Sequence, residues 1–208
     1  MIGKRSAAAA HTMGPADRTT AAGSSNVTSI VTTAFFAAVI FLGIQSFRIP
    51  LPAAVGTPFL HFGHIFVMLA IICLGGRRSC IAGVLGLVLF DLLNGYIHSI
   101  PDVFVSTIIK CLLVGAVFSS LKKKAAGDGR REYLAAVLCA ALYGIVNILV
   151  DLTWSVAGLM LLGSSFTAAL AAELTSIPAT VINAGFTVIG ILLLYAPITA
   201  AYKRIPQR

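Results

Sequence analysis

Charged residues are scarce in this sequence of 208 residues. Lysine, arginine, aspartate and glutamate make up 11% of the chain, whereas apolar residues make up 58% and the mean hydropathy is +0.96. A soluble domain carries about 25% charged residues, and a small globule has too much surface to hide so many apolar side chains. A water-soluble enzyme is therefore excluded first, and we expect an all-α integral membrane protein.

Motifs for metal binding, nucleotide hydrolysis and catalysis are also missing. The cysteines form no C-x-x-C pair, so neither a zinc site nor a redox motif is indicated, and we expect buried free thiols. The chain has no G-x-x-x-x-G-K-[ST] phosphate loop and no G-x-S-x-G or H-E-x-x-H motif. We therefore expect a protein that is not an enzyme, with no catalytic residue, no metal and no cofactor.

The chain carries a formal net charge of +8. In a soluble protein such a charge indicates nucleic-acid binding, but no RNA- or DNA-binding motif is visible. Lysine and arginine are also enriched in the cytoplasmic loops of membrane proteins, where they orient the helices. We adopt this second explanation and expect no nucleic-acid partner.

Six apolar segments have the length of membrane-spanning helices, since a bilayer core about 30 Å thick needs about 20 helical residues. They cover residues 27–46, 58–75, 79–96, 101–121, 133–154 and 168–196. The second and third are short, and Pro178 supplies a cause for a kink in the long sixth segment. The hydrophilic stretch 122–132 predicts a loop, and Gly75-Gly76-Arg77-Arg78 predicts a tight turn.

The two ends of the chain are polar, and we expect both in the cytoplasm. Residues 1–26 are typical of a disordered tail, residues 27–200 form the predicted transmembrane domain, and residues 201–208 are a basic C-terminus. A signal peptide is the alternative for the first part of the chain, but the apolar run 27–46 is too long for one.

The basic residues test this topology. With six spans, 13 of the 15 lysines and arginines lie on the cytoplasmic side, Arg48 lies in an outer loop and Lys110 lies within a helix. An odd number of spans would place a basic cluster outside. The sequence therefore predicts a multi-pass protein of the cell membrane with six transmembrane helices and cytoplasmic N- and C-termini.

Four ionisable side chains interrupt the predicted spans: Asp91, Lys110, Asp151 and Glu173. A charge at bilayer depth costs several kcal/mol and usually faces a cavity or a partner. In the predicted topology all four lie in the outer half or near the midplane, with Lys110 about 13 Å past Pro101 at a rise of 1.5 Å per residue. This placement indicates a pocket that opens to the exterior.

Polar residues also repeat at helical spacing, as expected if they line one pocket. Tyr143, Asn147 and Asp151 follow each other at i, i+4 and i+8, and Trp154 extends the stripe. Further groups are Asp91 and Asn94, with Tyr96 just beyond them; Thr107 and Lys110; Glu173, Ser176, Thr180, Asn183 and Thr187; and the pair His61 and His64. The candidate substrate-binding residues are His61, His64, Asp91, Asn94, Tyr96, Lys110, Asn147, Asp151, Trp154, Glu173 and Asn183.

Simpler roles remain open for the charged and polar members of this set. Lys110 can neutralise Asp91 or Glu173 as a structural pair, and Asp151 can extend to the outer membrane interface. The polar stripe of the last segment can serve hydrogen bonds between helices.

The histidines and aromatic residues also have alternative roles. His61 and His64 can be interfacial residues, and a metal site built on them needs a third ligand for which the sequence offers no strong candidate. Tyr96 and Trp154 can be interfacial aromatics, whereas in a pocket they would offer flat faces to a ring-shaped ligand.

The stretch HFGHIFVMLAIICLGGRRSCIAGVLGLVLFDLLNGY, from His61 to Tyr96, resembles the signature of substrate-binding S components of energy-coupling factor (ECF) transporters. PDVFVSTIIKCLLVG, from Pro101 to Gly115, resembles the next helix of that family, and RIPLP at 48–52 resembles the loop after its first helix. The resemblance covers residues 30 to about 196. Cys111 and His64 depart from the residues most common in the family at these places.

The resemblance implies an S-component-like bundle that captures a small water-soluble vitamin or precursor, with a hydroxymethylpyrimidine- or pyridoxine-like ring compound favoured. It implies a transmembrane coupling subunit and two cytoplasmic ATPases as partners, with docking through Ala34 and Ala38 of an Ala-x-x-x-Ala face. The alternative is a stand-alone proton-coupled carrier in which Asp151 or Glu173 titrates. A membrane enzyme acting on a lipid or isoprenoid is disfavoured, because no D-D-x-x-D motif occurs.

Overall fold

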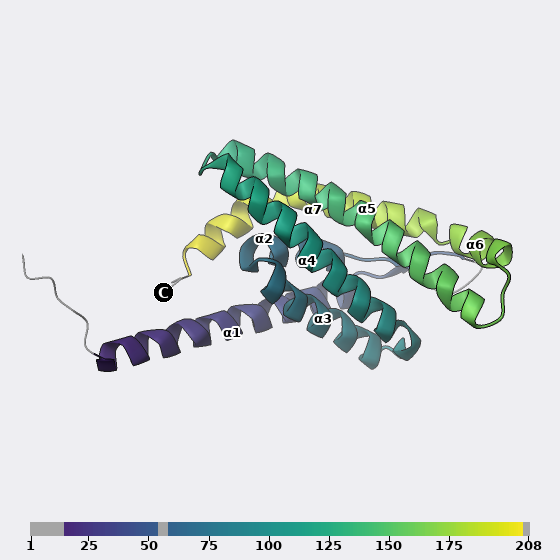
Figure 1. Cartoon of the computed structure of the whole chain (residues 1–208), viewed down its shortest axis with the longest axis horizontal. Coiled ribbons are helices and arrows are strands. Elements are labelled where there is room, and N and C mark those ends of the chain that lie inside the picture. Colours follow the sequence, from purple (N-terminus) through teal and green to yellow (C-terminus); the bar gives the residue numbers. More distant parts are fainter. Residues whose placement is uncertain (1–14, 54–57, 206–208) are drawn as a thin grey trace, which may run out of the picture.

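The protein is a helical bundle, seen here in a computed structural model that describes residues 15–53 and 58–205. The helices are α1 (Pro15–Ser46), α2 (Gly63–Leu74), α3 (Gly76–Leu93), α4 (Ile100–Ala125), α5 (Gly129–Leu161), α6 (Phe166–Leu174) and α7 (Ile177–Lys203), as Figure 1 shows. A 3-10 turn, Ile97–Ser99, precedes α4. Strands β1 (Ile49–Pro50) and β2 (Phe59–Leu60) pair antiparallel, a hairpin that the sequence does not predict. The expected all-α membrane protein is confirmed.

Helix α2 lies at the centre of the bundle, where α1, α3, α4, α5 and α7 all pack against it. Most of its 12 residues are buried, because a helix that is apolar on every side is stable only when it is covered on every side. At 1.5 Å per residue it is about 18 Å long, shorter than a bilayer core of about 30 Å. Its N-terminal end therefore lies inside the bundle, where it can contribute to a site.

Four helices in the described part of the chain are long and apolar enough to cross a membrane. They are Asn26–Ser46 of α1, Ile97–Ala125, Gly129–Leu161 and Ile177–Lys203. The second and third predicted spans correspond to the short α2 and to α3, which has 18 residues. These four helices support a multi-pass membrane protein and leave the count of six spans as a prediction.

The turn between α2 and α3 consists of one residue. Gly75 has a φ of 78°, a left-handed conformation that glycine adopts without the steric cost of a Cβ. The predicted turn was longer, but Gly76, Arg77 and Arg78 already belong to the first turn of α3. Arg78 donates from Nη1 to Ser29 Oγ at 2.6 Å and so connects α3 to α1.

A close approach of backbones joins the start of α3 to α4. A Cβ on Gly115 would lie 2.5 Å from Cα of Gly76, so alanine at 115 forces the two helices apart. We expect Gly115→Ala to destabilise the protein by about 1–3 kcal/mol, the usual range for overpacking. The measurement is the midpoint of thermal unfolding in detergent.

Gly185 of α7 provides the matched control, since a Cβ there meets no atom within 4 Å. Gly185→Ala is expected to leave the unfolding midpoint unchanged or slightly raised, because alanine favours helix over glycine. A Gly115→Ala protein that unfolds at the same temperature as the parent would show that this helix contact tolerates a methyl group.

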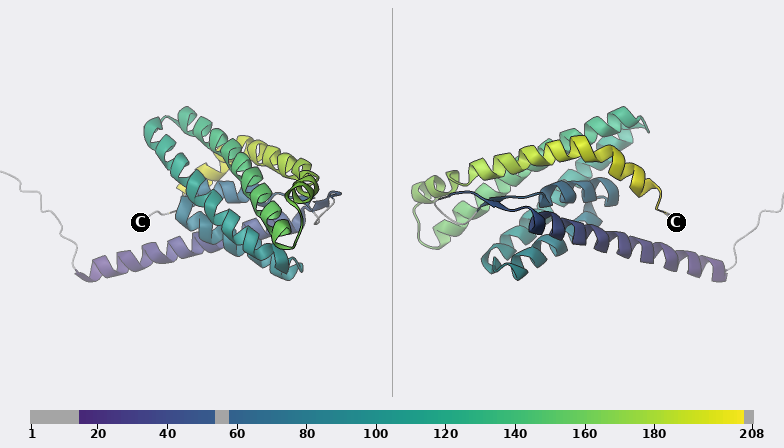
Figure 2. Two further views of the ribbon diagram at one scale, coloured as in Figure 1. Left: turned by 45° about the vertical axis from the view of Figure 1, so that its right-hand side comes forward. Right: turned by 180° about the vertical axis from the view of Figure 1, so that it is seen from behind.

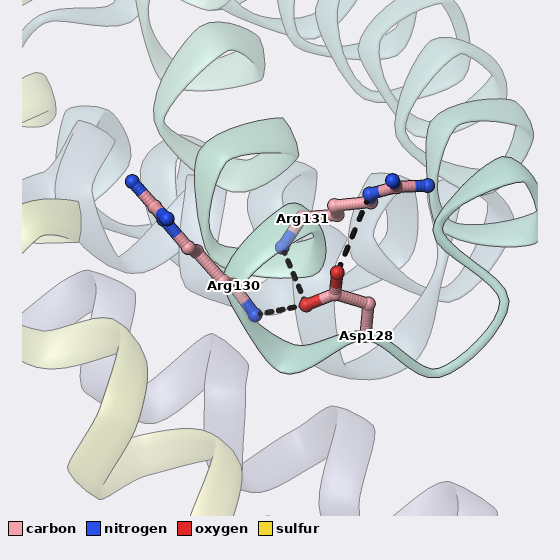
Figure 3. A network of polar contacts seen from close by, with 3 residues as sticks. All are labelled: Asp128, Arg130 and Arg131. Atoms are coloured by element: carbon pink, nitrogen blue, oxygen red, sulfur yellow. Dashed lines mark hydrogen bonds and ion pairs between the residues drawn. The ribbon is translucent and has the colours of Figure 1, made fainter.

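The predicted loop 122–132 is largely helical. α4 continues to Ala125 and α5 begins at Gly129, because lysines stabilise the C-terminal end of a helix and aspartate caps the next N-terminus. Figure 3 shows that cap: Asp128 Oδ1 accepts from the backbone N–H groups of Arg130 at 2.9 Å and Arg131 at 3.3 Å. Its other oxygen forms an ion pair with Nε of Arg131 at 3.3 Å.

The N-terminal segment also differs from the prediction. Residues 15–26 continue α1 as helix, although the tail 1–26 was expected to be disordered. Its alanines favour helix, and Pro15 stands at the first helical position, where proline is tolerated. Residues 1–14 and 206–208 of the predicted tails lie outside the described residues.

The last predicted span is two helices instead of one kinked helix. α6 ends at Leu174 and α7 begins at Ile177, with Pro178 in its first turn, where the missing N–H removes no helical bond. α7 runs beside α5 and bends in its C-terminal part (Figure 2), where Pro197 lies inside the helix. The predicted kink at Pro178 is therefore wrong; the chain breaks just before this residue. α5 is also longer than predicted and ends at Leu161.

Candidate functional site

Two adjoining cavities lie among the helices and share three carboxylates, those of Asp91, Asp102 and Asp151. The inner cavity has a volume of about 140 Å³ and is also lined by Ile44, His61, His64, Leu87, Val103, Ser106, Thr107, Lys110 and Asn147. The outer cavity has a volume of about 420 Å³, within the range of roughly 300–1,000 Å³ typical of small-molecule sites. The shared carboxylates mark the border between the two cavities.

A polar chain crosses the inner cavity from α4 to α5. Lys110 is 2% exposed, and its Nζ donates to Oδ1 of Asn147. The amide nitrogen of Asn147 in turn donates to Oδ2 of Asp151 at 2.6 Å. The ammonium group also lies 5.6 Å from the ring centroid of Tyr143, a favourable cation–π distance. The carboxamide of Asn147 thus links the buried ammonium group of Lys110 to the carboxylate of Asp151 through two hydrogen bonds.

The end of the inner cavity next to α2 is formed by the two histidines. Their rings have centroids 4.6 Å apart, and Nδ1 of His64 lies 3.0 Å from the hydroxyl of Tyr143. Nδ1 of His61 accepts from the backbone N–H of Gly63 at 3.1 Å, which fixes this ring at the start of the helix. Within the described residues no group of three or more metal-ligating side chains surrounds them.

Asn183 of α7 holds this end of the site in place. Its Oδ1 accepts from the backbone N–H of His61 and its Nδ2 donates to the carbonyl of Phe59, both at 3.0 Å. Asn183 lines neither cavity, so its role here is to position the segment that carries His61. Asn183 of the polar stripe therefore bonds to the segment 59–61, whereas the simpler alternative expected hydrogen bonds between helices.

The outer cavity combines aromatic rings with acceptor groups. Tyr96 and Trp154 line it, together with Phe59, whose ring centroid is 5.8 Å from that of Tyr96. Glu173 of α6 also lines it, and the α6–α7 break brings Ser176 and Thr180 to the same wall. Such a lining offers flat apolar faces and hydrogen-bond acceptors to a ligand that has both a ring and polar groups.

The structure brings most of the predicted site residues together. Of the eleven candidates, nine line one of the cavities or both: His61, His64, Asp91, Tyr96, Lys110, Asn147, Asp151, Trp154 and Glu173. Asn183 lines neither cavity and supports the site indirectly, through its hydrogen bonds to His61 and Phe59. Asn94 lines neither cavity; its amide donates to Gln45 Oε1 and to the carbonyl of Phe90, both at 2.9 Å.

Asp102 is a site residue that the sequence reasoning missed. The predicted intramembrane charges are limited to Asp91, Lys110, Asp151 and Glu173, although Asp102 lies within the predicted span 101–121. A signal was present, since Asp102, Ser106 and Lys110 follow each other at i, i+4 and i+8, and all three line the inner cavity. Phe59 was missed because it belongs to the unpredicted hairpin.

Comparison with known families decides what kind of protein carries this site. A model of the family described as ECF-type riboflavin transporter, S component, matches residues 24–203. The chain belongs to this ECF S-component family. No curated protein and no solved structure matches it.

Membership confirms the resemblance seen in the sequence between residues 30 and 196 and makes the chain a transporter subunit of the cell membrane. An S component is not an enzyme class; it is the substrate-binding subunit of its transporter. The predicted docking residues of the S component, Ala34 and Ala38, are exposed on α1, whereas Ile40 of the same helix is buried against the core.

Proposed function

We propose that this S component captures a small vitamin from outside the cell in the two adjoining cavities. The observation that supports this most strongly is the convergence of Asp91, Lys110 and Asp151, three ionisable groups from three helices, on one polar void. Charges at bilayer depth are costly and are retained where they contact a solute or each other. The family supplies the class of solute, a vitamin.

The proposed orientation has six spans with both termini in the cytoplasm. It rests on the basic clusters at the ends of the spans, such as Lys122 to Lys124 at the end of α4. In this orientation the outer cavity faces the exterior. A transmembrane coupling subunit would dock on the exposed Ala34 and Ala38 face of α1, and two cytoplasmic ATPases would supply energy.

We place riboflavin first among the ligands. The family description names it, whereas nothing in the site singles out hydroxymethylpyrimidine or pyridoxine. The outer cavity supplies the aromatic faces of Tyr96 and Trp154 for a planar ring system, and the border carboxylates can accept hydrogen bonds from a hydroxylated chain.

The test is mass spectrometry of small molecules that copurify with the protein, followed by binding titrations. Riboflavin, hydroxymethylpyrimidine, pyridoxine and thiamine are titrated into ligand-free protein in the absence of ATP. We expect saturable binding of riboflavin with one site per chain. Lack of saturable binding of every vitamin would refute the binding function, and tight binding of another vitamin would refute the flavin assignment alone.

A further inference from the structure

The border between the two cavities holds acceptor atoms that have no donor. Asp91 is 6% exposed, and its Oδ2 is buried without a hydrogen-bond partner. Oδ1 of Asp102 is in the same situation, and the fully buried hydroxyl of Thr107, within the inner cavity, also has no hydrogen-bond partner. Buried polar atoms are nearly always hydrogen-bonded, because water is lost on burial and must be replaced. All three residues line the inner cavity, so a bound ligand can supply the missing donors.

The nearby cations do not supply them. The Lys110 ammonium donates to Asn147 and lies near the ring of Tyr143, and it forms no ion pair. The guanidinium of Arg48 lies 5.2 Å from the ring centroid of Phe90, and Arg48 lines neither cavity. Across the residues that the structure describes, the only ion pair joins Arg131 to Asp128, at the opposite end of α5.

The balance of charge around the ligand space is negative. Asp91, Asp102 and Asp151 line both cavities, and Glu173 lines the outer one. Among the described lining residues, Lys110 in the inner cavity is the one lysine or arginine. All three aspartates line the inner cavity as well as the outer one, so their carboxyl groups form one cluster. A solute that enters through the outer cavity meets these carboxylates before it reaches Lys110.

We propose that Asp91 and Asp102 form a donor-binding subsite that determines specificity. It accepts hydrogen bonds from hydroxyl or amino groups on the polar arm of the ligand, and it excludes the form of the same ligand that carries a phosphate or carboxylate. This inference rests on the proposed function. A phosphate monoester carries about −1.5 to −2 charges at pH 7 and offers only acceptor oxygens to these carboxylates.

The test compares riboflavin with riboflavin 5′-phosphate, which share the ring and differ at the end of the hydroxylated chain. We expect the parent protein to bind the phosphate at least about 100-fold more weakly than riboflavin, measured by titration at equal pH and salt. In Asp91→Asn and in Asp102→Asn, which keep the shape and remove the charge, the ratio is expected to fall below about 10-fold. Glu132→Gln, at the start of α5, is the control and should keep the parent ratio.

The outcomes separate the subsite from the proposed function. Equal affinity for the two flavins in the parent protein, or an unchanged ratio in both aspartate variants, overturns the subsite while riboflavin binding upholds the function. If riboflavin does not bind, the flavin assignment fails, and the same ratio is measured for the vitamin that does bind and its phosphate ester. Should Asp91→Asn fail to fold, Asp102→Asn decides, because Asp102 is only partly buried and its loss disturbs packing less.

Discussion

Tryptophan in place of Ala38 is expected to reduce vitamin uptake to the background level and to leave vitamin binding intact. Ala38 is exposed on α1, one helical turn from Ala34, so the two small side chains lie on the same face of the helix. Small residues let a second helix approach closely, and an indole ring at this position would hold that helix away. Uptake of labelled vitamin is measured in cells that also produce the coupling subunit and the ATPases, and binding is measured on purified protein.

Leu138→Trp is the matched control for this experiment. Leu138 is 64% exposed on α5, away from α1, so the same bulky ring there should leave uptake near the parent value. Loss of uptake in both variants would indicate a general effect of surface tryptophan. Full uptake by Ala38→Trp would remove the docking role from this face of α1.

Lys110→Met is expected to weaken vitamin binding by about 10- to 100-fold. Methionine has a similar length but neither charge nor donor. Asn147 therefore loses its bond to the ammonium group, and the carboxylates lose the one lysine or arginine among the described residues that line the inner cavity. In the complex we expect the ammonium to donate to the vitamin as well, and a hydrogen bond that involves a charged group contributes about 1.5–3 kcal/mol, which corresponds to this range of affinity. The measurement is the dissociation constant of the purified variant, together with its unfolding midpoint.

Lys124→Met tests whether any loss of positive charge has this effect. Lys124 lies in the last turn of α4, exposed and far along the helix from Lys110, and its replacement should leave the dissociation constant unchanged. A Lys110→Met protein that binds as tightly as the parent would show that the lysine has a purely structural role.

The sequence predicted those parts of the site that follow from helical spacing. Tyr143, Asn147 and Asp151 are four residues apart, and one face of a helix is enough to place the last two in the same cavity. The convergence of Asp91 and Lys110 was predicted from the free-energy cost of placing a charge within the bilayer, because such a charge requires a polar neighbour. These inferences need only local geometry and the energy of burial.

Features that depend on contacts between distant segments were not predictable in this way. The hairpin that carries Phe59 is formed by two-residue strands, too short for any alternating pattern, and is held from α7 by Asn183. The break between α6 and α7 was assigned to a kink at Pro178, yet proline is tolerated in a first helical turn and the interruption precedes it. Asp102 lies in the first turn of α4, and the sequence alone does not show that a cavity is formed at this helix end.

The side chain of Asn147 between Lys110 and Asp151 has a consequence for the cost of binding. Its oxygen accepts from Lys110 of α4, and its nitrogen donates to Asp151 of α5. One carboxamide therefore orients both charged groups before a ligand arrives. A ligand that binds there does not have to order these side chains first, so less free energy is lost on association.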